Sequence, residues 1–166
     1  MPFTSLRPWP LAPRPFGEEA FGSWLGRIAS RYQLSVIQTW EINQLGTLPA
    51  LTSAGWILFP AVPGSTLELL AALARLSFDR LVRIQTPPEW MVDRPSLPYC
   101  FRCLVLNSAD ISSPRWKRRW FDPDVKGCEE HETDLEHIPA AILRQAPNME
   151  HLISLVSKYR RESSET

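Results

Sequence analysis

Residues 99–131 read YCFRCLVLNSADISSPRWKRRWFDPDVKGCEEH, and this stretch decides how the chain is organised. It contains Cys100, Cys103 and Cys128, the three cysteines of the 166-residue chain, and it ends at His131. The motifs C-x2-C and C-x2-H each leave two residues between their ligands, a spacing that lets both ligands reach one ion. Two such pairs complete the tetrahedral geometry that zinc prefers. We therefore predict one zinc ion, structural rather than catalytic because four protein ligands leave no open position.

Other interpretations of these residues remain open. One is a redox C-x2-C motif beside an unrelated cysteine and histidine, but such motifs normally open a helix in a βαβ unit, and residues 99–103 show no such context. His137 could replace His131 as a ligand, although its spacing from Cys128 fits less well. His151 falls on a predicted helix, where a surface position is expected. Three cysteines cannot form a closed set of disulfides, which favours metal binding over a secreted scaffold.

A basic and aromatic cluster lies between the two ligand pairs: Arg115, Trp116, Lys117, Arg118, Arg119 and Trp120. Cations beside aromatic rings suit phosphate contacts and base stacking, and they equally suit an acidic protein surface. A third interpretation is structural, with the tryptophans clamping the loop around the metal. Residues 122–136 then carry seven acidic residues against Lys126 alone. Acidic residues repel phosphate, so the second ligand pair favours a protein contact.

Helical patterns dominate the chain before residue 90. Residues 17–32 give the clearest helix, and Glu18 and Glu19 are expected in its first turn, where the helix dipole favours acidic side chains. Its apolar face consists of Phe21, Trp24, Leu25, Ile28 and Tyr32. Capping boxes that begin at Ser35 and Ser65 predict two further helices, and Ser77 opens a fourth. The four helices form two pairs spaced like helix-turn-helix motifs, and a plain helical bundle is the alternative.

The remaining segments predict a proline-rich arm, a loop and a closing helix. Residues 1–16 are expected to be extended and to pack on the domain through Trp9. Residues 46–64 predict a loop with an apolar anchor. Residues 139–161 predict a helix capped by Asn148, and residues 160–166 predict a frayed tail.

Composition excludes several classes of protein. The 18 basic and 18 acidic residues give a net charge of zero, which excludes a generic basic nucleic-acid coat protein. The apolar fraction of 44% excludes disorder across the whole chain. No apolar run is long enough to span a membrane, and the N-terminus has no signal-peptide pattern, so we expect a cytoplasmic protein with no membrane association. No phosphate-binding glycine loop, G-x-S-x-G or H-E-x-x-H motif is present, and we predict no enzyme.

Two groups of motifs resemble the TniQ family. Residues 15–29, PFGEEAFGSWLGRIA, are similar to the opening of TniQ proteins, with a proline-rich arm, a Gly-Glu pair and a Ser-Trp-Leu-x-Arg helix. The order of C-x2-C, residues 116–120 and C-x2-H is similar to the family's C-x2-C, W-R-x-x-W and C-x2-H. Together the matches bracket residues 8–135. Many members have a second cysteine cluster, but no cysteine follows Cys128 here, which keeps the prediction at one zinc. Glu132 follows His131 where glycine is frequent.

The resemblance implies a function as well as a fold. TniQ proteins are accessory factors of DNA transposition related to the target-site selector TnsD. The resemblance implies an N-terminal helix-turn-helix region, a zinc-ribbon region, and an adaptor that joins a target-recognition element to the AAA+ transposition ATPase of the TnsC type. In CRISPR-associated transposons that element is an RNA-guided effector, and DNA is contacted within the larger assembly.

We therefore predict a mainly α fold with a small zinc ribbon, in four parts. These are an arm (1–16), a helix-turn-helix-like domain (17–90), a single-zinc β-ribbon (91–138) and a C-terminal helix with its tail (139–166). The predicted function is a transposition adaptor in the bacterial cytoplasm, at the nucleoid when assembled, in which the cluster at residues 115–120 contacts DNA or an acidic surface of the ATPase. The alternatives are a stand-alone DNA-binding regulator and a non-catalytic zinc scaffold unrelated to transposition.

Overall fold

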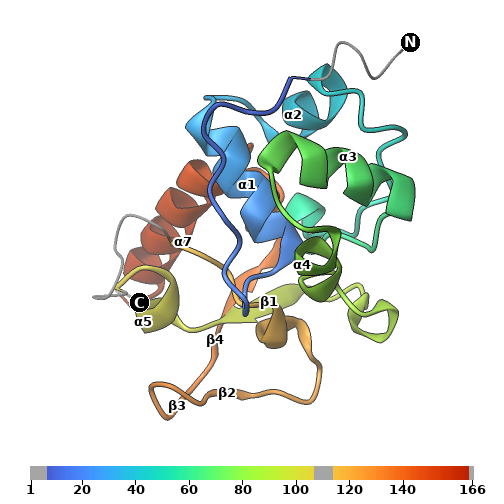
Figure 1. Cartoon of the computed structure of the whole chain (residues 1–166). Coiled ribbons are helices and arrows are strands. Elements are labelled where there is room, and N and C mark those ends of the chain that lie inside the picture. Colours follow the sequence, from blue (N-terminus) through green and yellow to red (C-terminus); the bar gives the residue numbers. More distant parts are fainter. Residues whose placement is uncertain (1–6, 107–113, 165–166) are drawn as a thin grey trace.

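The computed structural model describes residues 7–106 and 114–164, and within these the chain is mostly helical (Figure 1). The α-helices are α1 (Phe21–Arg31), α2 (Val36–Ile42), α3 (Gly64–Ala74), α4 (Phe78–Arg83), α5 (Phe101–Leu104), α6 (Ala140–Leu143) and α7 (Met149–Ser164). Three short 3-10 helices are η2 (Gly55–Ile57), η3 (Pro88–Trp90) and η4 (Arg118–Phe121). The strands are β1 (Ser96–Tyr99), β2 (Gly127–Cys128), β3 (Thr133–Asp134) and β4 (Glu136–Pro139).

Helix α1 forms the centre of the helical layer, with α7 packed along one side and η2 and α2 on others (Figure 1). Its predicted apolar face is confirmed, since Phe21, Trp24 and Ile28 have no exposed surface. The expectation that Glu18 and Glu19 lie in the first helical turn is wrong, because the helix begins only at Phe21. Residues 7–16 of the predicted arm run along α1 (Figure 1), while residues 1–6 lie outside the described residues.

Two glycines inside α1 allow η2 to approach the helix closely. A Cβ atom on Gly22 would overlap the backbone oxygen of Trp56, and one on Gly26 would lie 2.5 Å from the Trp56 ring. Glycine in a helix is less favourable than alanine by about 1 kcal/mol. Here the missing side chains leave room for the buried loop that carries Trp56. The predicted apolar anchor of residues 46–64 is therefore confirmed.

The predicted helix caps agree with the structure at two of three serines. Ser35 forms a complete capping box with Gln38, and the Ser77 hydroxyl accepts a hydrogen bond from the backbone N–H of Arg80. The box predicted at Ser65 is wrong, because α3 already begins at Gly64 after Pro63. Proline fixes its own backbone geometry in a way that starts a helix without a side-chain cap, so Ser65 lies inside the first turn.

The strands form two small antiparallel sheets below the helices (Figure 1). In the first sheet β1 pairs with β4, and Leu97 lies opposite Ile138. In the second sheet β2 pairs with β3, and Cys128 lies opposite Thr133. The predicted β-structure around the cysteines is thus present, while the helix-turn-helix and zinc-ribbon arrangements themselves stay predictions.

The helical pattern predicted at residues 139–161 is present but interrupted rather than continuous. Residues 136–139 form β4, α6 ends at Leu143, and Pro147 separates α6 from α7. The predicted cap is confirmed, because the Asn148 side chain accepts a hydrogen bond from the backbone N–H of His151. Helix α7 continues to Ser164, so the expectation of a frayed tail is wrong for residues 160–164.

One apolar cluster runs through the described part of the chain, from Trp9 in the arm to Val156 in α7. Trp9 is 8% exposed, and its indole N–H donates to the Asn43 side chain, which confirms the predicted anchor of the arm. Residues on both sides of position 90 belong to this cluster, and the division into four parts stays a prediction. None of the described helices is long and apolar enough to cross a membrane.

Candidate metal centre

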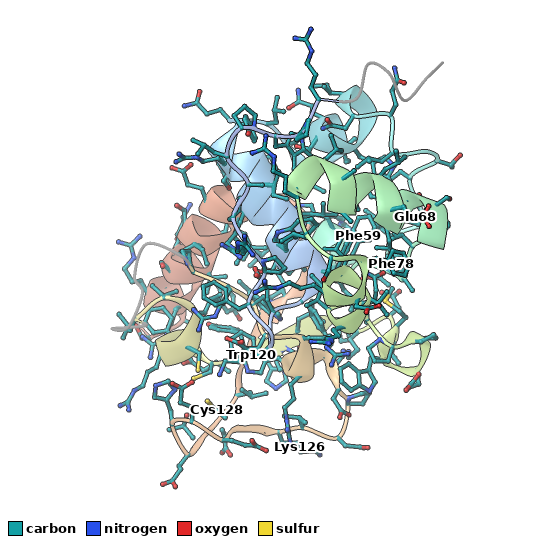
Figure 2. All side chains as sticks on the ribbon, in the orientation of Figure 1. Phe59, Glu68, Phe78, Trp120, Lys126 and Cys128 are labelled. Carbon is teal, nitrogen blue, oxygen red and sulfur yellow. The ribbon has the colours of Figure 1, made fainter. Side chains whose placement is uncertain are left out.

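The C-x2-C and C-x2-H motifs meet at one point below the sheet. Cys100 follows β1 directly and caps α5, while Cys103 lies inside α5. Cys128 ends β2, and the turn from β2 to β3 carries His131 back toward it. The ligand atoms of all four side chains lie within 4.8 Å of one another, with the cysteines buried and the histidine half-buried. In Figure 2, Cys128 lies at the lower end of the molecule, below the buried Trp120.

The distances within this cluster fit a tetrahedral metal site. His131 Nδ1 lies 3.3 Å from Cys103 Sγ, and it lies 3.5 Å from the Sγ atoms of Cys100 and Cys128. Cys103 Sγ lies 3.6 Å from Cys128 Sγ. Ordinary zinc bond lengths place tetrahedral ligands about 3.6 Å apart for sulfur and nitrogen and about 3.8 Å apart for two sulfurs. The four residues can therefore hold one metal ion.

The electrostatics of the cluster favour a bound cation. Burial raises the pKa of the Cys103 thiol, and the neighbouring Cys128 and Cys100 sulfurs raise it further. Burial also opposes ionisation of Cys128, but hydrogen bonds from the backbone and ring of His131 lower the pKa of that thiol to about 7. Neighbouring thiolates repel one another, and a bound cation offsets that repulsion.

The other two histidines lie outside the cluster. His137 is in β4, where its Nδ1 is 3.4 Å from the Ser96 hydroxyl. His151 is on the first turn of α7, with its ring beside Asn148. The cluster of metal-ligating atoms within the described residues uses His131, as the motif spacing predicts.

The two tryptophans of the basic cluster belong to the core. Trp116 is 0% exposed and Trp120 is 2% exposed, and their rings meet edge to face with centroids 5.5 Å apart. Tyr99 and Phe121 complete this aromatic group beside β1. These rings join the metal region to the helical layer, as the structural interpretation of the cluster expects.

The cations of the same cluster all have partners within the chain. Arg115 pairs with Glu18, Lys117 with Glu130 and Arg119 with Glu129, at 2.7, 3.0 and 2.6 Å. Arg118 donates to the backbone oxygen of Gln85 and lies over the Trp90 ring. Arg119 has a side chain that is 60% exposed, against 17% for Arg115 and 20% for Lys117. A contact between this cluster and DNA or a partner stays a prediction, and Arg119 is its most accessible member.

A buried ion pair that the sequence analysis did not identify ties three segments together. Glu19 has no exposed surface and binds Arg27 through both carboxylate oxygens, at 2.6 and 2.9 Å. The same carboxylate accepts hydrogen bonds from the backbone N–H of Phe16 and from the Ser23 hydroxyl. The Ser23 oxygen in turn accepts the backbone N–H of Trp116, so the pair links the arm, α1 and the metal region.

The sequence contained a signal for this network. Glu19, Ser23 and Arg27 follow one another at intervals of four residues, which places them on one face of a helix or of its entry. The backbone adds to the connection through an isolated antiparallel bridge between Glu19 and Lys117. Sequence alone could not show that this face is buried, because its cover comes from residues almost a hundred positions away.

One comparison with known proteins found a match. The family model for TniQ matches residues 10–135 of the 166-residue chain, a segment that includes all four candidate ligands. No curated protein matches the chain.

Proposed function

This chain belongs to the TniQ family, whose members are non-catalytic accessory proteins of transposition, and from that premise we propose that it acts as a transposition adaptor. The adaptor connects a target-recognition element, with an RNA-guided complex as one candidate, to the AAA+ transposition ATPase assembled on DNA. The family match carries this proposal. Recruitment of one component by another raises its local concentration at the target, which is how a protein without catalytic residues can direct a reaction.

The surface of the first helix pair supports an adaptor over a stand-alone reader of DNA sequence. Helix α2 and its flanking residues, SVIQTWEINQ at positions 35–44, contain no lysine or arginine. Its exposed side includes Ile37, 44% exposed, and Ile42, 64% exposed, together with Glu41. Recognition helices depend on basic side chains that meet phosphates, and on basic and amide side chains that meet base edges. Two of the amides in this stretch bond within the chain, Gln38 to the backbone N–H of Ser35 and Asn43 to the backbone oxygen of Thr39. An apolar and acidic surface suits a protein partner better.

We propose zinc as the metal, held by Cys100, Cys103, Cys128 and His131. When bound, zinc supplies a structural cross-link, and the four protein ligands leave it no open position for substrate. The cross-link fixes β1 and α5 against the turn between β2 and β3. This arrangement keeps the segment with Arg119 in a defined place on the surface.

The adaptor proposal is tested by co-sedimentation of the full chain with the AAA+ ATPase of the same transposition system, assembled on DNA with ATP. Wild type is compared with Ile42→Asp and Arg119→Glu. The matched controls are Val92→Asp, at an apolar residue that is 43% exposed, and Lys126→Glu, at an exposed cation of the same metal region. We expect sedimentation that requires the ATPase and that falls at least fivefold in one or both of the first two variants.

Each other outcome has a definite meaning. Sedimentation with DNA alone, without the ATPase, favours the DNA-binding regulator. Absence of sedimentation with either component contradicts the adaptor and leaves the scaffold as the surviving function. Equal loss in the variants and in their controls would show that the contact lies elsewhere on the molecule.

A further inference from the structure

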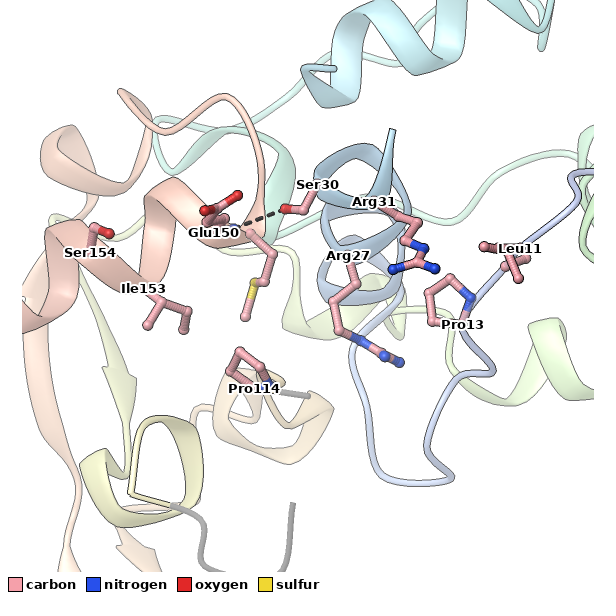
Figure 3. A pocket seen from close by; sticks show the side chains of 11 residues that line it. Leu11, Pro13, Arg27, Ser30, Arg31, Pro114, Glu150, Ile153 and Ser154 are labelled. Atoms are coloured by element: carbon pink, nitrogen blue, oxygen red, sulfur yellow. Dashed lines mark hydrogen bonds between the residues drawn. The ribbon is translucent and has the colours of Figure 1, made fainter. Parts of the chain in front are cut away.

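A groove runs along α7 on the side that faces α1 and the arm. Its larger hollow has a volume of about 680 Å3 and lies between α1, α7 and the arm (Figure 3). A second hollow of about 470 Å3 continues along α7 toward its C-terminal end. Ile153 and Ser154 line both hollows, so the two form one surface, which we call the α7 groove. Its combined size accommodates several residues of an extended peptide.

The floor of the α7 groove is aliphatic. Leu11 and Pro13 from the arm and Met149 and Ile153 from α7 all line the larger hollow, and Leu11 is 56% exposed. An exposed leucine on an ordered arm beside a half-buried isoleucine is the kind of apolar surface that marks an interaction site when it is rimmed by charge. Methionine adds a flexible side chain that adapts to different apolar groups.

The rim of the α7 groove is basic. Arg27 and Arg31 line the larger hollow, and Arg160 and Arg161 line the second. Glu19 neutralises Arg27, and Glu136 pairs with Arg160. Within the described part of the chain no carboxylate lies at ion-pair distance from Arg31 or Arg161. Among the described residues that line the larger hollow Glu150 is the one acidic residue, so the described lining has an excess of positive charge.

These features distinguish between classes of ligand. Among the described residues that line the larger hollow none is aromatic, and the ring of Phe101 in the second hollow is covered by Arg160 at 3.9 Å. Single-stranded nucleic acids rely on stacking against exposed rings, and Glu150 would repel their phosphates. An aliphatic floor with a cation near each end instead complements a peptide that combines apolar side chains with carboxylates.

We propose that the α7 groove binds an acidic peptide segment of another protein, with an apolar side chain between Leu11 and Ile153 and carboxylates against Arg31 and Arg161. The source of that segment, a protein of the transposition assembly, rests on the proposed adaptor function. The binding chemistry of the groove is independent of the proposed adaptor function. The adaptor would thereby have a second protein contact on the side of the molecule formed by the arm and α7.

The test is a selection of random twelve-residue peptides, displayed on phage, against the full metal-loaded chain. Enriched peptides are synthesised with a fluorescent label, and their Kd is measured by anisotropy. We expect acidic peptides with aliphatic residues, whose Kd rises at least tenfold with the double variant Arg31→Glu/Arg161→Glu. The matched control, Arg83→Glu/Lys158→Glu, makes the same charge change at exposed residues outside the groove, one of them on α7 itself.

Three outcomes would overturn the proposal: no enrichment over an unrelated protein, enrichment of basic peptides, or equal affinity for both double variants. A labelled dT12 oligonucleotide is tested in parallel, and binding that is lost only in Arg31→Glu/Arg161→Glu would assign the groove to nucleic acid instead. The selection contains no ATPase, so its result is independent of the co-sedimentation experiment. Either proposal can therefore fail while the other stands.

Discussion

The Glu19 carboxylate is a buried hydrogen-bond acceptor for both the arm and α1. It accepts two hydrogen bonds from Arg27, one from the arm at Phe16 and one from Ser23. Removal of one member of a buried ion pair leaves the other charge uncompensated, which destabilises proteins by about 3–5 kcal/mol. We expect Glu19→Gln to lower the free energy of unfolding by that amount, measured by urea denaturation.

The neighbouring residue provides the control for that prediction. Glu18 pairs with Arg115, but its side chain is 42% exposed, and exposed pairs contribute about 0–1 kcal/mol. Glu18→Gln should therefore change stability by less than about 1 kcal/mol. Similar losses in both variants would contradict a special role for the buried carboxylate.

Glu132 adopts a backbone conformation that favours glycine. Its φ of 52° lies in the left-handed region, directly after His131. This conformation is costly for a side chain with a Cβ atom by about 1–2 kcal/mol and is worst for β-branched residues. We expect Glu132→Gly to leave thermal stability within about 0.5 kcal/mol of wild type, because relieved strain offsets the greater freedom of the unfolded chain.

Glu132→Val is the counterpart of that variant. It should destabilise the metal-bound protein by at least about 1 kcal/mol, measured by thermal denaturation, because valine is β-branched. A stable valine variant would show that the turn changes its conformation instead.

At the residue scale, the sequence predicted the ligand set but not the ion pair. The four ligands stand in two short motifs, and a gap of two residues is a local constraint visible in the chain itself. The role of Glu19 depends on its burial and on its bridge to Lys117, which is a long-range contact. The sequence pattern instead predicts that Glu19 interacts with the helix dipole in a first helical turn, which is a weaker and local effect.

At the scale of the elements, the α1–η2 contact depends on glycine. Gly22→Ala places a methyl group against the backbone oxygen atoms of Trp56 and Ile57, which cannot rotate away as a side chain could. Overpacking destabilises by about 1–3 kcal/mol, which exceeds the gain of about 1 kcal/mol in helix propensity. We expect a net loss of up to about 2 kcal/mol in the free energy of unfolding, measured by chemical denaturation. Gly17→Ala, with nothing within 4 Å of the added Cβ, should be neutral.

Helix-capping patterns predicted the starts of helices correctly where no neighbouring residue changed the start. The capping box at Ser35 and the cap at Asn148 are satisfied within a single turn of chain, and both are present. The box at Ser65 failed because Pro63 had already started α3. The strand at residues 136–139 pairs with β1, about forty residues away, and periodicity in one segment does not reveal that partner.

At the scale of the whole molecule, metal removal tests how far the metal centre supports the fold. A cross-link between Cys103 and Cys128, which are 25 residues apart, stabilises by about 3–4 kcal/mol through loop-closure entropy alone. For a protein of this size that corresponds to a fall in Tm of about 7–14 °C on chelation. We expect one metal ion per chain by mass spectrometry under native conditions, and loss of both ion and stability in Cys103→Ser.

His137→Ala is the control for that experiment, since His137 is the alternative ligand that lies outside the cluster. Its metal content and Tm should match wild type. Loss of metal from this variant would contradict the assignment of His131. Retention of the ion by Cys103→Ser would contradict the four-residue site as a whole.

The contact of α1 with α7 also forms late during synthesis of the chain. The Ser30 hydroxyl accepts the backbone N–H of Glu150, a partner translated 120 residues later. At about 5–20 residues per second, the ribosome needs about 6–24 s to cover that interval. Through this time the buried side of α1 that α7 will cover is exposed on a nascent chain. Helix α1 is thus synthesised early, but its packing against α7 forms among the last contacts of the chain. During translation the apolar face of α1 is therefore a natural target for chaperones.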